Sequence, residues 1–145
     1  MGNTKDIIIG REKEQALIQE YYESPKAELV AIYGRRRVGK TYLIKSYFNQ
    51  QFDFYFTGSF ETPKSTLLRL FQTQLERYSG EKRKKPQDWF EAFEQLRDYL
   101  SSLDKERIVI FLDELPWMDT PKSNFIQAFS YFWNSWASTV HGMKL

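Results

Sequence analysis

One eight-residue segment constrains the fold of this chain more than any other. Residues 34–41 read Gly-Arg-Arg-Arg-Val-Gly-Lys-Thr, with four residues between the two glycines. The apolar run at 28–33 before it predicts a buried strand, and residues 39–48 after it predict a helix. The pattern G-x-x-x-x-G-K-[ST] between a strand and a helix is typical of a phosphate-binding loop. The segment therefore predicts an α/β fold with an anion site at the start of a helix.

The residue types in this segment suit phosphate chemistry. Glycine lets backbone N–H groups approach an anion closely, and the start of a helix favours negative charge. In such loops the lysine reaches the β- and γ-phosphates and the Ser or Thr hydroxyl binds Mg²⁺. The predicted nucleotide-binding residues are Gly34, Arg35, Arg36, Arg37, Val38, Gly39, Lys40, Thr41 and Tyr42, with Lys40 also catalytic and Thr41 a metal ligand. The alternative is a glycine-bracketed turn whose lysine and threonine face solvent.

A second acidic motif lies at 108–114, which reads Ile-Val-Ile-Phe-Leu-Asp-Glu. A buried parallel strand carries its last residue to the carboxyl edge of the sheet, where open α/β sheets bind ligands. Asp113 would hold Mg²⁺ there, directly or through water. Glu114, one residue on, could act as general base toward the attacking water. The alternative is a solvated acidic strand end.

The remaining pattern alternates strands and helices. Strands are predicted at 28–33, 52–57 and 107–112, a short apolar run lies at 7–9, and helices are predicted at 11–22, 39–48, 62–78, 86–103 and 121–141. Thr62-Pro63 and Thr120-Pro121 have the form of helix starts, and Gly80 and Gly142 of helix stops. The alternation predicts a parallel sheet covered by helices on both faces.

Composition excludes several classes of protein. The length of 145 residues suits one domain, and no cysteine is present, which excludes disulfides and thiol catalysis. The single histidine, His141, cannot form a histidine metal cluster, and a net charge of +2 exerts no general attraction on nucleic acid or anionic membranes. The uncharged stretch at 123–140 has a one-sided apolar stripe, so a buried amphipathic helix is favoured over a membrane span. We expect a cytoplasmic protein.

Three segments together resemble a known family: residues 9–12 (Ile-Gly-Arg-Glu), 33–41, and 111–117 (Phe-Leu-Asp-Glu-Leu-Pro-Trp). They are similar to the archaeal-type ATPases, P-loop ATPases of the STAND branch of the AAA+ superfamily, over residues 7 to about 141. The resemblance implies an ASCE-type P-loop NTPase sheet with flanking helices and binding of ATP and Mg²⁺. It also implies that Asp113 is the Mg²⁺-associated Walker B acid and Glu114 the catalytic glutamate. Thr57 and Ser59 correspond to the place of a polar switch residue.

The sequence differs from the family's pattern at the end of the chain. Such ATPases continue with a fourth strand, which lies between the strands matching 28–33 and 107–112, then a fifth strand and a helical lid. We therefore expect residues 1–145 to be the N-terminal portion of a single P-loop ATPase domain, truncated before the fourth and fifth core strands. No arginine finger can be assigned, and we expect the fragment alone to be a weak or inactive ATPase.

The sequence thus predicts an ATP-binding P-loop domain, with Mg²⁺-dependent hydrolysis in the intact protein. One alternative is a nucleotide-dependent signalling switch or scaffold with little hydrolysis. Another is a nucleic-acid-associated module, which rests on the basic run at 82–85 and is disfavoured for this chain alone. The expected partner is ATP; a protein partner or self-association stays open, and no membrane partner is expected.

Overall fold

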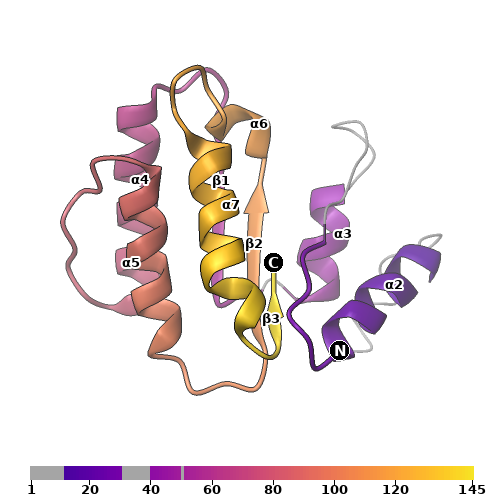
Figure 1. The fold of residues 1–145 in the computed structure, drawn as a ribbon. Helices are drawn as coiled ribbons and strands as arrows, with labels where there is room; N and C mark the ends of the chain where they lie inside the picture. Colours follow the sequence, from indigo (N-terminus) through magenta and orange to yellow (C-terminus); the bar gives the residue numbers. More distant parts are fainter. Residues whose placement is uncertain (1–11, 31–39, 50) are drawn as a thin grey trace.

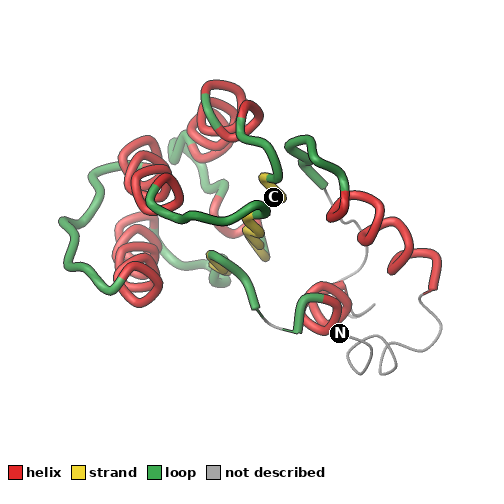
Figure 2. Tube along the Cα trace, turned by 90° about the horizontal axis from the view of Figure 1, so that it is seen from below, coloured by secondary structure: helices red, strands yellow, loops and turns green. Residues whose placement is uncertain are grey.

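The computed structural model describes residues 12–30, 40–49 and 51–145. The described elements are α2 (Glu12–Glu23), α3 (Lys40–Tyr47), β1 (Phe54–Thr57), α4 (Lys64–Ser79), α5 (Trp89–Ser101), β2 (Ile108–Asp113), α6 (Leu115–Met118), α7 (Phe125–Ser135), the 3₁₀ turn η1 (Ala137–Thr139) and β3 (Met143–Lys144). The strands lie between α4, α5 and α7 on one side and α2 and α3 on the other (Figures 1 and 2). This is the expected α/β arrangement.

The described sheet is parallel, in the order β1-β2-β3. Its longest register joins β1 to β2 and places Thr57 opposite Asp113. On the other side of β2, Ile108 lies opposite Met143. Residue Glu28 in turn forms a parallel bridge with Lys144. The segment that leads toward the glycine-rich loop is therefore separated from β2 by β3.

The two faces of the sheet bury different sets of side chains. On one face, Ile108 and Ile110 of β2 join a large core with α4, α5 and α7, whose centre includes the fully buried Trp89. On the other face, the Phe111 ring packs against a smaller core made by α2 and α3. That smaller core consists of Ile18, Leu43, Ile44 and Tyr47. Because β2 is apolar on both faces, it requires a helical layer on each side.

Several predicted helix ends are wrong. Helix α4 begins at Lys64 with Pro63, and not Thr62, at the N-cap. Helix α5 begins at Trp89 and not at residue 86, because the Asp88 side chain accepts a hydrogen bond from the Glu91 N–H at 2.9 Å. The prediction for Gly80 is confirmed: it has a left-handed φ of 73°, and its N–H donates to the Glu76 carbonyl.

The C-terminal region differs most from the sequence prediction. Thr120-Pro121 does not start the last helix, which begins at Phe125 after Asn124 in the left-handed region and ends at Ser135. The chain then forms η1 and reaches Gly142, where a Cβ would lie 2.0 Å from the Glu106 carbonyl oxygen. This close approach lets the chain enter β3. The expected absence of any strand after the last helix is therefore wrong, and β3 lies where the resemblance implied a fourth strand.

The predicted strand at 28–33 is described only over its first three residues. There, the Glu28 N–H donates to the Met143 carbonyl at 2.8 Å and the Val30 N–H to the Leu145 carbonyl at 2.9 Å. Leu29 is 46% exposed, so the expectation of a buried strand fails at this residue. Residues 31–33 and the apolar run at 7–9 lie outside the described residues. No helix in the described part of the chain has the length and apolarity needed to cross a bilayer.

A buried carboxylate fixes the start of the β1–β2 pair. One oxygen of the Asp53 carboxylate accepts a hydrogen bond from the Val109 N–H at 2.8 Å. The other oxygen forms an ion pair with the Lys105 ammonium at 2.7 Å. The Asp53 backbone carbonyl accepts the Tyr99 hydroxyl at 2.8 Å, and burial raises the pKa of Tyr99. This one residue therefore joins β1, β2 and α5.

We predict that Asp53→Ala lowers the free energy of unfolding by about 2–3 kcal/mol, because it leaves the buried Val109 N–H unpaired. Lys105→Ala is the matched control: its side chain is half-exposed, so its loss should cost less than about 1 kcal/mol. Urea unfolding followed by circular dichroism measures both values. Equal losses would show that the ion pair, and not the backbone contact, stabilises this corner.

Candidate functional site

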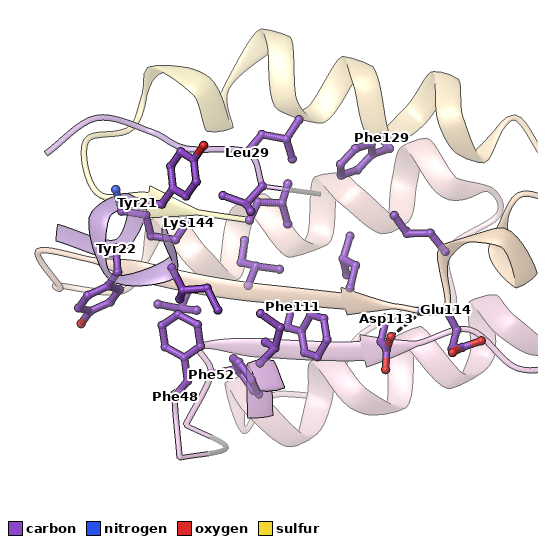
Figure 3. A pocket seen from close by; sticks show the side chains of 18 of the residues that line it. Tyr21, Tyr22, Leu29, Phe48, Phe52, Phe111, Asp113, Glu114, Phe129 and Lys144 are labelled. Atoms are coloured by element: carbon purple, nitrogen blue, oxygen red, sulfur yellow. Dashed lines mark hydrogen bonds between the residues drawn. The ribbon is translucent and has the colours of Figure 1, made fainter. Parts of the chain in front are cut away.

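A groove of about 560 Å³ lies along β2, between α7 on one side and α2 and α3 on the other (Figure 3). Its walls are mainly apolar. They come from β2, α2, α3, α6 and α7 and from the chain around Glu28 and β3: Ile18, Tyr21, Tyr22, Leu29, Val30, Ile44, Phe48, Phe52, Val109–Leu112, Leu115–Trp117, Phe129, Lys144 and Leu145. Asp113 and Glu114 lie at one end of the groove, where β2 ends. The groove therefore combines apolar walls with a localised negative charge.

The acidic end is a sharp turn from strand to helix. Asp113 is only 7% exposed; its backbone carbonyl accepts the Gly58 N–H, and its Oδ1 accepts the Glu114 N–H, both at 2.9 Å. Glu114 adopts a left-handed conformation with φ 57° and ψ 41°. A non-glycine residue in this region stores strain, a feature that often marks functional sites. The turn leaves two carboxylates on successive residues at the carboxyl end of β2.

Two residues that sequence reasoning missed hold this turn. A Cβ on Gly58 would lie 2.5 Å from the Glu114 carbonyl oxygen, so only glycine allows the end of β1 to approach Glu114 so closely. The indole Nε1–H of Trp117 donates to Glu114 Oε2 at 3.0 Å. The signals were a glycine directly after a predicted strand and a tryptophan three residues after the second acid. Neither signal identifies its partner without the fold.

The other predicted site residues are described only in part. Residues 34–39 lie outside the described residues, and Lys40 and Thr41 are the first two residues of α3. Tyr42 is 52% exposed. Helix α3 begins at the end of the sheet at which β2 ends and α6 begins (Figure 1). The start of α3 and the acidic turn therefore share one end of the sheet, as in α/β proteins that bind anionic ligands there.

The residues suggested as a polar switch lie beside the acidic turn. Thr57 is paired in register with Asp113, and its hydroxyl donates to the Gly58 carbonyl at 3.1 Å. Ser59 is exposed in the loop after β1.

The lysine in the groove wall has a structural role. Lys144 is buried, and its ammonium donates to the carbonyls of Ser24 and Lys26, both at 2.7 Å. Burial, as the largest effect, lowers the pKa of Lys144. Arg107 similarly donates to the carbonyls of Tyr22 and Glu23 at the end of α2. Cations at the C-terminal carbonyls of a helix are stabilising, so these two residues fix α2 to the sheet.

The acidic turn offers oxygen ligands for a hard cation. No group of three or more His, Cys, Asp or Glu side chains suited to a metal occurs among residues 12–30, 40–49 and 51–145. Mg²⁺ usually takes only one or two protein carboxylates and completes its octahedron with water and phosphate oxygens. The buried Asp113 carboxylate at the end of β2 can supply one such ligand. The acidic turn therefore suits a cation that also binds water and phosphate oxygens, and not a cation held by protein ligands alone.

Comparison with known proteins gives the family. A family model described as an ATPase domain predominantly from Archaea matches residues 8–143. The chain therefore belongs to this family. It is also similar to an uncharacterized ATP-binding protein from Methanocaldococcus jannaschii, with 42% identity over 41 residues, which are 28% of this chain and 70% of that protein. No solved structure matches the chain significantly.

We predict that Gly58→Ala lowers the free energy of unfolding by about 1–3 kcal/mol and moves the Trp117 indole N–H signal in ¹H–¹⁵N spectra. The added methyl would push against the Glu114 carbonyl and lie 3.1 Å from the Trp117 Cβ. Gly80→Ala is the control, because its φ of 73° strains alanine by about 1–2 kcal/mol while its surroundings are open. An unchanged indole signal in Gly58→Ala would contradict the close approach.

Proposed function

We propose that this member of the family of ATPase domains binds Mg²⁺·ATP at the acidic end of the groove and hydrolyses the β–γ phosphoanhydride bond. The observation that carries the proposal is the turn after β2, where Asp113 and Glu114 share one end of the sheet with the start of α3. The similarity to an ATP-binding protein supports ATP as the nucleotide.

The proposed roles follow the residue types. Residues 34–42 would surround the phosphates with backbone N–H groups, and Lys40 would neutralise charge on the β- and γ-phosphates. The Thr41 hydroxyl and the Asp113 carboxylate would hold Mg²⁺, which neutralises charge that develops on the phosphate oxygens. No metal ligand needs to come from elsewhere in the chain under this proposal.

Glu114 is the proposed general base. A carboxylate next to the metal acid can accept a proton from water while the water oxygen bonds to the γ-phosphorus. The bond from the γ-phosphorus to the β–γ bridging oxygen then breaks, and ADP and phosphate leave. The surroundings of the turn support this role, because the two carboxylates have different partners: Asp113 Oδ1 accepts the Glu114 N–H and Glu114 Oε2 accepts the Trp117 indole N–H.

The finer classification belongs to the same proposal. We assign the chain to the STAND branch of the AAA+ ATPases, as a single ASCE-type P-loop domain that acts in the cytoplasm.

We predict that Lys40→Ala weakens Mg²⁺·ATP binding at least tenfold, because the positive charge that would face the phosphates is lost. Lys45→Ala is the matched control: it lies on the same helix, with its ammonium 4.6 Å from the centre of the Tyr55 ring. Isothermal titration measures affinity, and circular dichroism verifies that both variants are folded. An unchanged affinity in the Lys40 variant would overturn the proposed phosphate site.

Glu114→Gln keeps the size of the side chain and removes its basicity. We predict unchanged Mg²⁺·ATP affinity and a single-turnover rate that falls by about 10²–10⁴, the usual contribution of a general base. Asp119→Asn removes an exposed acid at the other end of α6 and should leave both values unchanged. Turnover at the parent rate in the Glu114 variant would show that Glu114 is not the general base.

A further inference from the structure

We propose that Trp117 is the positioning residue of Glu114 and that Phe60, from the loop after β1, holds the Trp117 indole in place. The inference rests on the proposed function, because it gives Glu114 the role of base. It adds to the acidic motif a hydrogen-bond donor and an aromatic contact, which come from α6 and from the loop after β1.

The contact between Trp117 and Glu114 has a defined direction. The indole Nε1–H donates to Glu114 Oε2 at 3.0 Å across one turn of α6. Indole is a donor without a basic nitrogen, so it can orient a carboxylate but cannot take its proton. A carboxylate has two oxygens with two lone pairs each, so one accepted N–H does not by itself exclude a further hydrogen bond. Trp117 therefore suits a positioning role and not that of a proton relay.

The indole itself is held from a second segment of the chain. The Phe60 ring meets the Trp117 ring edge to face, with centroids 4.6 Å apart and an interplanar angle of 84°. Phe60 is 58% exposed, so this contact is not imposed by a buried core. Aromatic pairs of this geometry stabilise by about 0.5–1.5 kcal/mol beyond their area burial. The loop after β1 thereby restricts the rotamer of Trp117.

The backbone explains why Glu114 needs such a partner. Glu114 is the N-cap residue of α6, in a left-handed conformation, and the helix has only four residues. The buried Met118 anchors α6 in the larger core, and this contact fixes the backbone of the helix. A flexible glutamate side chain loses entropy when it is oriented, and a fixed donor supplies part of that orientation in advance.

The test uses Trp117→Phe, which keeps an aromatic ring against Phe60 and removes the N–H donor. We expect Mg²⁺·ATP affinity within twofold of the parent and a single-turnover rate about 10–100-fold lower, the scale for a misplacement of about 1 Å. The two Glu114 Hγ protons should differ in chemical shift in the parent and become nearly equivalent in the variant. Trp133→Phe is the matched control and should change neither value.

Two further variants separate orientation from basicity. Glu114→Gln keeps an acceptor oxygen, so the Trp117 indole N–H signal should stay near its parent position while turnover falls. Phe60→Ala keeps the donor and removes the ring contact, so it should reduce turnover less than Trp117→Phe does.

The outcomes distinguish this inference from the proposed function. Parent protein that binds no Mg²⁺·ATP would overturn the proposed function and the inference with it. Normal binding with equal turnover in the parent and Trp117→Phe would overturn the inference alone. If the parent binds Mg²⁺·ATP without turnover above the Lys40→Ala background, the Hγ signals decide: loss of their separation in Trp117→Phe supports the positioning role, and an unchanged separation overturns it.

Discussion

The parallel pairing of β1 with β2 is the constraint on which the site depends. The Asp53 carboxylate joins the start of β1 to the Val109 N–H, and the register then runs without a break to Thr57 opposite Asp113. Because strand spacing is regular, this register fixes where the chain leaves each strand. Gly58 consequently meets the Glu114 turn, and the loop that follows carries Phe60 to Trp117.

Each face of β2 contributes to the site in a different way. The larger core holds α6 through Met118, so the acidic turn is tied to the larger of the two described cores. The smaller core holds α3 against Phe111, which sets the start of that helix at the same end of the sheet. Strain at Glu114 persists because packing from Gly58 and α6 determines the local backbone.

The region around β3 links the C-terminal residues to the end of α2 and the segment that follows it. Met143 and Lys144 lie between β2 and the segment at Glu28, and the Lys144 ammonium and the Arg107 guanidinium bind carbonyls at or after the end of α2. These contacts join residues about a hundred positions apart in sequence through buried or partly buried cations. The order of strands is therefore a property of long-range pairing, which local hydrophobic pattern does not encode.

The sequence by itself determined the alternation of strands and helices, the αL stop at Gly80 and the acids at the end of β2, because apolar periodicity and glycine are local signals. The starts of α4 and α7 that local signals predict, at Thr62 and Thr120, are wrong, because several neighbouring residues there can serve as caps. Only the tertiary structure decided the insertion of β3, the need for glycine at 58 and the pairing of Trp117 with Glu114 and Phe60. Each of these depends on how closely two separate backbones or side chains approach, a distance set by packing that no sequence spacing contains.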